Sequence, residues 1–154
     1  MDYRGLFEDA IDTLRREKRY RVFADLERIA GHFPKAIFRD TADNEREITI
    51  WCSNDYLGMG QHQKVISAMQ ETAGKLGTGA GGTRNIAGTN RPLVQLERSL
   101  ADLHRKEAAL VFTSGFVSNE ASISTIARLI PNCLVISDQL NHASMIAGVK
   151  QSGM

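Results

Sequence analysis

The apolar residues of this chain recur every three or four positions in five stretches, a spacing that is typical of amphipathic helices. The five stretches are residues 6–14, 62–76, 93–103, 117–129 and 141–149. Two of them also carry start signals, because Asp2 can cap the first helix and Pro92 suits the first helical position of the third. The hydrophobic pattern therefore predicts five helices along the chain.

Short runs of apolar and β-branched residues predict strands between these helices. Residues 48–52 form one run, and the polar stretch 40–47 before it predicts a turn that joins two strands. Two further runs, 108–113 and 133–137, have the composition expected of buried strands. Because helices are predicted on both sides of each run, we expect these two strands to be parallel, with right-handed crossovers.

This order of elements predicts an α/β fold in two parts. Residues 1–58 are expected to form an N-terminal segment of a helix and small strands, and residues 59–154 the first part of a mainly parallel-sheet large domain. A sheet of two or three parallel strands buries little apolar surface, so we expect an incomplete sheet and the front part of a larger domain. Ligands in such folds bind at the carboxyl ends of the strands, which here carry TSGFVSNE and SDQLNHAS.

Composition and charge narrow the classes of protein. The chain has 154 residues, 42% of them hydrophobic, which indicates a globular protein rather than a disordered one. A formal net charge of +1 argues against a nucleic-acid or membrane partner. Cys52 and Cys133 lack C-x-x-C spacing and the four histidines lack H-x-x-x-H spacing, which argues against a disulfide framework and a metal site. Together with the absence of a signal-peptide pattern, these features predict a cytoplasmic protein.

The glycine-rich stretch TGAGGTRNIAGT, residues 78–89, is the strongest sign of a binding loop. Glycine allows backbone conformations with positive φ and a close approach to a ligand. Thr83, Arg84, Asn85 and Thr89 add hydrogen-bonding groups to the same loop. A loop this flexible and polar is costly to order, so we expect a ligand or a partner to order it.

Part of this loop fits a dinucleotide-binding pattern, but its context does not. Gly77, Gly79 and Gly82 match G-x-G-x-x-G, and Glu97 lies about twenty residues beyond the first glycine. That motif follows a strand and opens a helix, whereas here the preceding stretch, 62–76, has helical spacing and the following residues are irregular. We therefore reject a nicotinamide site and, because G-K-[ST] is absent, a P-loop.

Three positions have both a functional and a structural interpretation. Ser114, Gly115 and Phe116 join a predicted strand to a helix start, where backbone N–H groups suit a phosphate, although Ser114 also suits an ordinary helix cap. His142 can act as an acid or base, stack on a planar cofactor, or simply hydrogen-bond the backbone at a helix start. Arg21 can hold a carboxylate through two parallel N–H donors, or lie solvated on the surface, which is the commoner case.

Four motifs, arriving in order at compatible spacing, resemble those of the α-oxoamine synthase family. They are WCSNDYLGMG, TGAGGTRNIAGT, LADLHRKEAALVFTSGF and ISDQLNHASMI. The resemblance covers essentially the whole chain from Tyr3, and GGTRN with the upstream YRVF is similar to the aminolevulinate-forming branch of that family. Family members are homodimers of fold type I that depend on pyridoxal phosphate (PLP). The resemblance therefore implies PLP as cofactor and a homodimer in the full-length protein.

The resemblance also implies a reaction and a set of site residues. The reaction condenses glycine with succinyl-CoA, with release of CoA and CO₂, to give 5-aminolevulinate, a precursor of haem and other tetrapyrroles. By resemblance, backbone N–H groups of Ser114, Gly115 and Phe116 hold the PLP phosphate, and His142 stacks on the pyridine ring. The implied substrate residues are Arg21, Thr83 and Asn85 for the succinyl carboxylate, Ser137 for CoA and Asn54 for the amino-acid carboxylate.

The chain departs from the family in length and at one position. Family members are much longer, and the Schiff-base lysine belongs to later sequence, so we expect this chain to hold no catalytic residue and to be inactive alone. Phe116 stands where relatives often have tyrosine. Two alternatives stay open. One is an α-oxoamine synthase with another acyl-CoA or amino acid, which need not bind a carboxylate at Arg21, Thr83 and Asn85; the other is a non-catalytic nucleotide-binding or interaction fragment.

Overall fold

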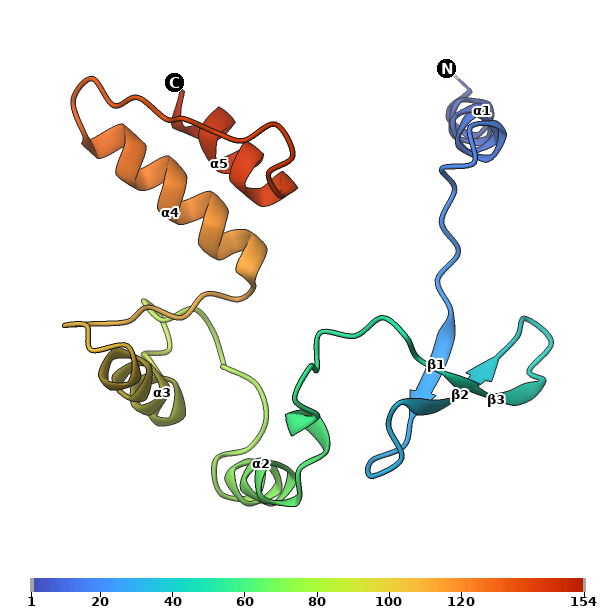
Figure 1. Cartoon of the computed structure of the whole chain (residues 1–154), viewed down its shortest axis with the longest axis horizontal. Helices are drawn as coiled ribbons and strands as arrows, with labels where there is room; N and C mark the ends of the chain where they lie inside the picture. Colours follow the sequence, from blue (N-terminus) through green and yellow to red (C-terminus); the bar gives the residue numbers. More distant parts are fainter. Residues whose placement is uncertain (1, 154) are drawn as a thin grey trace. The chain divides into compact units, whose positions relative to one another are not determined.

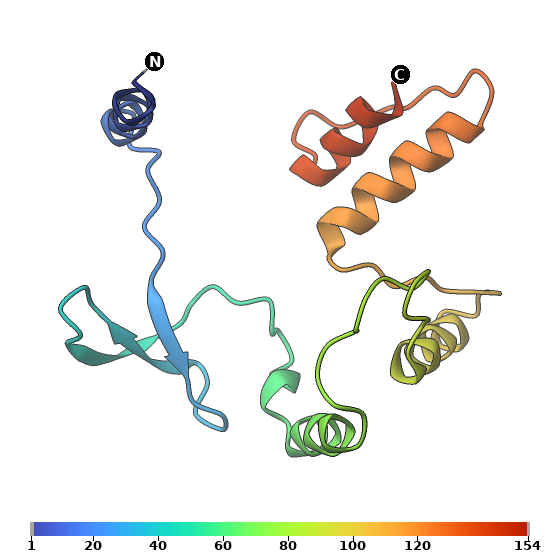
Figure 2. The same cartoon turned by 180° about the vertical axis from the view of Figure 1, so that it is seen from behind.

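The computed structural model describes residues 2–153, which form two compact units divided in sequence between Thr78 and Gly79. Figure 1 and Figure 2 show the helices and strands from opposite sides. The first unit contains α1 (Tyr3–Arg16), β1 (Asp25–Arg28), β2 (Lys35–Arg39), β3 (Glu45–Thr49), the 3₁₀ helix η1 (Met59–Gln61) and α2 (Gln63–Leu76). The second unit contains α3 (Arg91–Leu103), α4 (Gly115–Leu129) and α5 (Ala143–Ser152).

The five helices predicted from the apolar spacing are confirmed. Asp2 caps α1 by accepting the Gly5 N–H at 3.0 Å. Asn90 caps α3, so Pro92 takes the second helical position rather than the first. Helices begin where a side-chain oxygen can accept the free N–H groups of the first turn. For this reason α4 starts directly after Ser114, slightly earlier than the apolar pattern predicted.

A three-stranded antiparallel sheet with the order β1–β2–β3 lies in the first unit. Ala36 of β2 pairs with Ile48 of β3 and is fully buried. Exposed ion pairs connect the strands, since Arg39 of β2 contacts Glu27 of β1 and Glu45 of β3. The backbone hydrogen bonds of the ladder join the strands, and these exposed cross-strand pairs add only modestly to them.

The predicted turn before β3 is confirmed, but the strand itself is displaced. Asp40 accepts the N–H groups of Ala42 and Asn44 at 2.8 and 3.0 Å, which closes the turn between β2 and β3. β3 then runs from Glu45 to Thr49 rather than from residue 48 to 52. Pairing with β2 decides both ends, because a strand extends only as far as its neighbour supplies hydrogen-bonding partners.

Helices α4 and α5 pack side by side and begin at the same end (Figure 1 and Figure 2). Gly148 of α5 makes their close approach possible. A Cβ at this position would lie 2.9 Å from the Ile123 Cβ and 3.2 Å from the Asn119 carbonyl oxygen. Ala127 of α4 and Ser144 of α5 are also buried. Small residues thus allow the two helices to approach each other closely.

The expectation of two parallel strands in the second unit is wrong for the described residues. Residues 108–113 and 133–137 have no regular secondary structure, although helices flank both runs as expected. A strand needs a neighbouring strand to complete its backbone hydrogen bonds, and neither run has one between residues 2 and 153. Leu134 and Ile136 are correspondingly 82% and 89% exposed. The α/β class with an incomplete sheet is confirmed, but the sheet seen here is antiparallel.

Neither a membrane-spanning helix nor a metal site is found in the described part of the chain. Among residues 2–153, no helix is long and apolar enough to cross a membrane. In the same range, no group of His, Cys, Asp and Glu side chains is placed to hold a metal ion. The domain boundary expected after residue 58 concerns the longer fold and stays a prediction.

Candidate functional site

The starts of α4 and α5 form the first part of the candidate site. Ser114 Oγ accepts the Val117 N–H at 3.2 Å, and His142 Nδ1 accepts the Ser144 N–H at 3.2 Å. The structural interpretation of both residues as helix caps is therefore confirmed. A helix start also carries free N–H groups and the positive end of the helix dipole. Two neighbouring helix starts favour an anionic group such as a phosphate. Each cap uses only one of the free N–H groups, so capping and phosphate binding are compatible here.

Phe116 and His142 lie together beside these helix starts. Their ring centroids are 6.3 Å apart with an interplanar angle of 71°, which is an edge-to-face arrangement. Phe116 is 44% exposed, so a planar ligand has access to its ring. The structure thus brings together two residues, from separate motifs, that the resemblance assigned to the same cofactor.

A chain of hydrogen bonds orients the His142 ring. The Asn119 side-chain amide donates to the Ser144 hydroxyl at 3.0 Å, and that hydroxyl lies 2.7 Å from His142 Nδ1. Because Nδ1 accepts the Ser144 backbone N–H, the neutral ring carries its proton on Nε2. Ser144 is fully buried, whereas Asn119 and His142, which it connects, are exposed. Asn119 and Ser144 could not be found from the sequence, since no local pattern links residues on two different helices.

Ser137 lies in the segment that leads into α5. The Asn141 side-chain amide donates to Ser137 Oγ at 2.9 Å, and the Leu140 N–H donates to an Asp138 carboxylate oxygen at 2.8 Å. These bonds shape a turn in which Ser137 stays exposed. Its hydroxyl is accessible to a ligand, and its assignment to CoA stays a prediction.

The glycine-rich loop presents Thr83 and Asn85 on one turn. The Thr83 carbonyl oxygen accepts the N–H groups of Ile86 and Ala87 at 3.0 and 2.9 Å, and the side chains of Thr83 and Asn85 are exposed. The loop follows α2 directly and enters this turn instead of a helix start. Both observations agree with the rejection of a dinucleotide-binding motif.

Arg84, between these two residues, is held by Glu97 of α3 through two parallel hydrogen bonds. Its Nη1 and Nη2 atoms lie 2.7 and 2.8 Å from the two carboxylate oxygens. Glu97 also accepts the Val111 N–H at 2.9 Å. The bonds from Arg84, and then the bond from Val111, lower the pKa of Glu97 to about 2, so this carboxylate is ionised at neutral pH. In the sequence Glu97 stands out only as part of the rejected dinucleotide-binding motif, and no local pattern reveals its pairing with Arg84.

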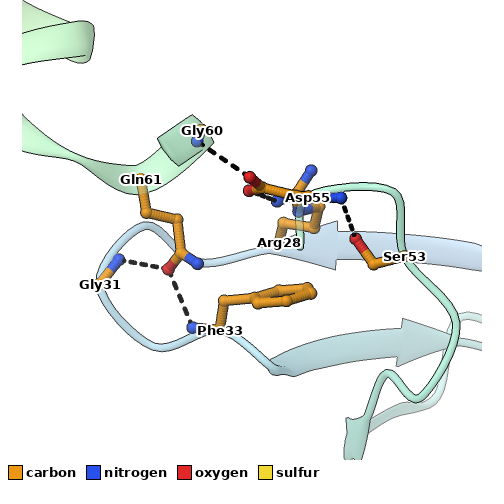
Figure 3. Close-up of polar contacts among 7 residues, drawn as sticks. All are labelled: Arg28, Gly31, Phe33, Ser53, Asp55, Gly60 and Gln61. Atoms are coloured by element: carbon orange, nitrogen blue, oxygen red, sulfur yellow. Dashed lines mark hydrogen bonds and ion pairs between the residues drawn. The ribbon is translucent and has the colours of Figure 1, made fainter. Parts of the chain in front are cut away.

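In the first unit, a polar network fixes the segment that carries Asn54 (Figure 3). The Asp55 carboxylate contacts Arg28 Nη2 at 3.1 Å and accepts the Gly60 N–H at 3.3 Å. Gln61 Oε1 accepts two further N–H groups, from Gly31 and Phe33, at 2.9 and 3.0 Å. These bonds attach residues 53–61 to the turn between β1 and β2. Asn54 itself is exposed, and its contact with an amino-acid carboxylate stays a prediction.

Arg21 lies in the exposed, irregular stretch between α1 and β1. It lines a shallow pocket with Leu14, Lys18, Arg19 and Tyr20. Arg19 is paired with Glu17 there, so Lys18 and Arg21 are the cationic side chains of the pocket that favour an anion. Arg21 belongs to the first unit, whereas Thr83 and Asn85 belong to the second. The shared carboxylate site of these three residues therefore stays a prediction.

Comparison with known proteins defines the class of this chain. Residues 46–154 match the model of the family "Aminotransferase class I and II", and the chain belongs to that family. It is 67% identical over 153 residues to the 5-aminolevulinate synthase of Bradyrhizobium diazoefficiens. It is also 54% identical to 5-aminolevulinate synthase 1 of Cereibacter sphaeroides and 48% identical to the mitochondrial 5-aminolevulinate synthase of Yarrowia lipolytica. These matches confirm the resemblance found in the motifs.

The matches cover nearly all of this chain but only a small part of each relative. Each of the three matches includes 99% of this chain, but only 37%, 38% and 27% of the respective relative. The chain therefore corresponds to the N-terminal part of such proteins and spans well under half of their length.

Proposed function

We propose that this chain is the N-terminal part of a PLP-dependent acyltransferase that condenses glycine with succinyl-CoA to 5-aminolevulinate, with release of CoA and CO₂. In this role it would serve haem and tetrapyrrole synthesis. The observation that carries the proposal is the similarity along nearly the whole chain to several proteins named 5-aminolevulinate synthase. The predicted site residues are of the types that can bind a phosphate, a planar ring and a carboxylate.

The residues at the starts of α4 and α5 fit PLP. The aminotransferase class I and II family and the 5-aminolevulinate synthases are PLP enzymes. Ser114, Gly115 and Phe116 would bind the phosphate through the first-turn N–H groups of α4, which have no acceptor inside the helix. His142, with its ring oriented by Ser144, would lie against the pyridine ring. When bound, PLP supplies an electron sink for a carbanion at the amino-acid α-carbon.

The remaining predicted residues would bind the two substrates. Arg21 can offer two parallel N–H donors to the terminal carboxylate of the succinyl group, and Thr83 and Asn85 can add neutral hydrogen bonds. A buried carboxylate requires such partners, because an unpaired charge is costly to remove from water. Asn54 would contact the glycine carboxylate and Ser137 the CoA portion. All of these residues lie in exposed loops that helices and strands hold in place, which is where binding residues are commonly found.

The partners and location of the complete protein are part of the same proposal. We expect a homodimer with a Schiff-base lysine in later sequence, and therefore no turnover by residues 1–154 alone. We propose a cytoplasmic location, which fits two separated cysteines in a reducing compartment. Relatives from Opsanus tau and Yarrowia lipolytica are named as mitochondrial, so fractionation of the source cells is the appropriate test of location.

A product assay tests the proposed activity. The protein should carry this chain and continue to the full length of its relatives, and it should be loaded with PLP. With glycine and succinyl-CoA we expect 5-aminolevulinate and free CoA in equal amounts. Butyryl-CoA, which has a neutral acyl chain of similar length, should react more slowly because it leaves the carboxylate-binding groups unpaired. Preference for the neutral thioester would instead support a different α-oxoamine synthase.

A further inference from the structure

The pairing of Arg84 with Glu97 is unusual among the ion pairs of this chain. Of the ion-paired side chains between residues 2 and 153, Glu97 is the least exposed, at 14%. Its carboxylate accepts three N–H donors, two from Arg84 and one from Val111. Bidentate, charge-assisted bonds of this kind fix geometry as well as charge, unlike most exposed pairs.

This pairing acts on the turn that presents Thr83 and Asn85. Arg84 lies between them, and its Nε also donates to Thr89 Oγ1 at 3.1 Å, which connects both ends of the turn. Glycine-rich segments lose much conformational entropy when they become ordered. An arginine with three of its N–H donors engaged removes part of that freedom before a ligand arrives. The neighbouring residues 83 and 85 are therefore presented in a defined arrangement.

The same pairing occupies Arg84. The motif GGTRN alone makes this arginine an obvious candidate for binding a substrate carboxylate. In the structure, however, both terminal nitrogens of its guanidinium already bind a carboxylate that belongs to the protein. An incoming carboxylate would have to displace Glu97 and leave its charge half-buried without a partner, which is costly. The geometry therefore favours a supporting role for Arg84.

We propose that Glu97 is a positioning residue for the acyl substrate: through Arg84 it fixes the turn that presents Thr83 and Asn85 to the succinyl carboxylate. This inference rests on the function proposed above. Glu97 does not touch the substrate in this account. Its bond to the Val111 N–H anchors the turn to the segment 108–113, which runs directly into the proposed phosphate-binding residues at Ser114.

The test uses the PLP-loaded protein of full relative length with Glu97→Gln, Arg84→Lys and the double variant. Each single substitution removes the bidentate ion pair between Arg84 and Glu97, so we expect the KM for succinyl-CoA to rise about tenfold. The KM for glycine should stay within about twofold of the unmodified value. Because both single variants lose the same interaction, the double variant should resemble either one rather than show the product of their effects. Glu107→Gln is the matched control, since Glu107 forms no ion pair with residues 2–153.

A second measurement needs no activity. Hydrogen exchange of the amides in residues 78–89 should be faster in Glu97→Gln than in the unmodified chain, and unchanged in Glu107→Gln. Equal exchange, or equal increases in KM for succinyl-CoA and glycine, would overturn the positioning role. A large effect of Arg84→Lys with no effect of Glu97→Gln would also overturn it, because Arg84 would then bind the substrate directly. Lack of turnover by the unmodified protein would overturn the proposed function itself, and this role with it.

Discussion

Two rings, Phe116 and His142, and one charged pair, Arg84 with Glu97, are the most informative side chains of this molecule. Phe116 and His142 could be recognised as candidate site residues from the sequence. A strand-like run followed by Ser-Gly, and a histidine at a helix start, are both local patterns. The ring contact and the charged pair could not be predicted. Each joins residues that are distant in sequence, and only the folded second unit brings them together.

The role of Arg21 can be tested by truncating its side chain. In the full-length protein, we expect Arg21→Ala to raise the KM for succinyl-CoA by about thirtyfold or more, because it removes one partner of a charged hydrogen-bonded pair. The preference for succinyl-CoA over butyryl-CoA should narrow, whereas PLP binding should be nearly unchanged. Arg19→Ala is the control, because Arg19 lines the same pocket but is already paired with Glu17 at 2.6 Å. An unchanged ratio of kcat/KM for the two thioesters would show that Arg21 is an ordinary surface arginine.

The low pKa of Glu97 predicts a pH-dependent contribution to stability. The bonds from Arg84 and Val111 lower the pKa of the folded state to about 2, below that of an unfolded glutamate. The stabilisation is therefore fully present above about pH 5 and is lost as the pH falls towards 2. We expect the difference in unfolding free energy between the unmodified chain and Glu97→Gln to shrink over that range. Urea unfolding at several pH values provides the measurement, and a difference that stays constant with pH would contradict this account.

At the level of helices and strands, local signals predict helices well and strands poorly. Asp2, Asn90 and Ser114 cap α1, α3 and α4 through their own side chains, so local residues determine where these helices begin. A strand depends on a partner that the local sequence does not reveal. β3 consequently begins at Glu45 in register with β2, and the apolar run 133–137 remains irregular.

The packing of α4 against α5 depends on Gly148. A Cβ added there would meet the Ile123 side chain and the Asn119 backbone, so we expect Gly148→Ala to destabilise the second unit by about 1–3 kcal/mol. Gly74→Ala in α2 is the matched control, because nothing lies within 4 Å of a Cβ at that position. There alanine should stabilise the helix by about 0.5–1 kcal/mol. Thermal unfolding of both variants decides the matter, and a neutral Gly148→Ala would contradict close packing of the two helices.

Considered as a whole, the chain buries few of its apolar side chains. Ala36 and Ala127 are the buried apolar residues among those described, while large side chains such as Trp51 and Leu140 are each 90% exposed. This agrees with a chain that spans 37% of its relative from Bradyrhizobium diazoefficiens. The sequence pattern predicted both the α/β class and the incompleteness of its sheet. It could not reveal which surfaces a longer protein would cover.

Activity should depend on the complete protein. We expect residues 1–154 alone, mixed with PLP, glycine and succinyl-CoA, to form no 5-aminolevulinate above a control that contains PLP only. The expected reason is that the Schiff-base lysine lies in later sequence, since free PLP reacts much less readily than PLP already activated as an enzyme imine. A colorimetric or mass-spectrometric assay for the product provides the measurement. Turnover that depends on one of this chain's own lysines would contradict the proposal that it holds only part of the active site.

The fate of the glycine carboxyl carbon tests the proposed condensation most directly. Glycine labelled with carbon-13 in its carboxyl group is supplied to the PLP-loaded protein of full relative length, with and without succinyl-CoA. We predict that labelled CO₂ is released only when succinyl-CoA is present, in equal amount to unlabelled 5-aminolevulinate, because the glycine carboxyl carbon is lost and its α-carbon is retained. Release of label without succinyl-CoA, or label retained in the condensation product, would contradict the account.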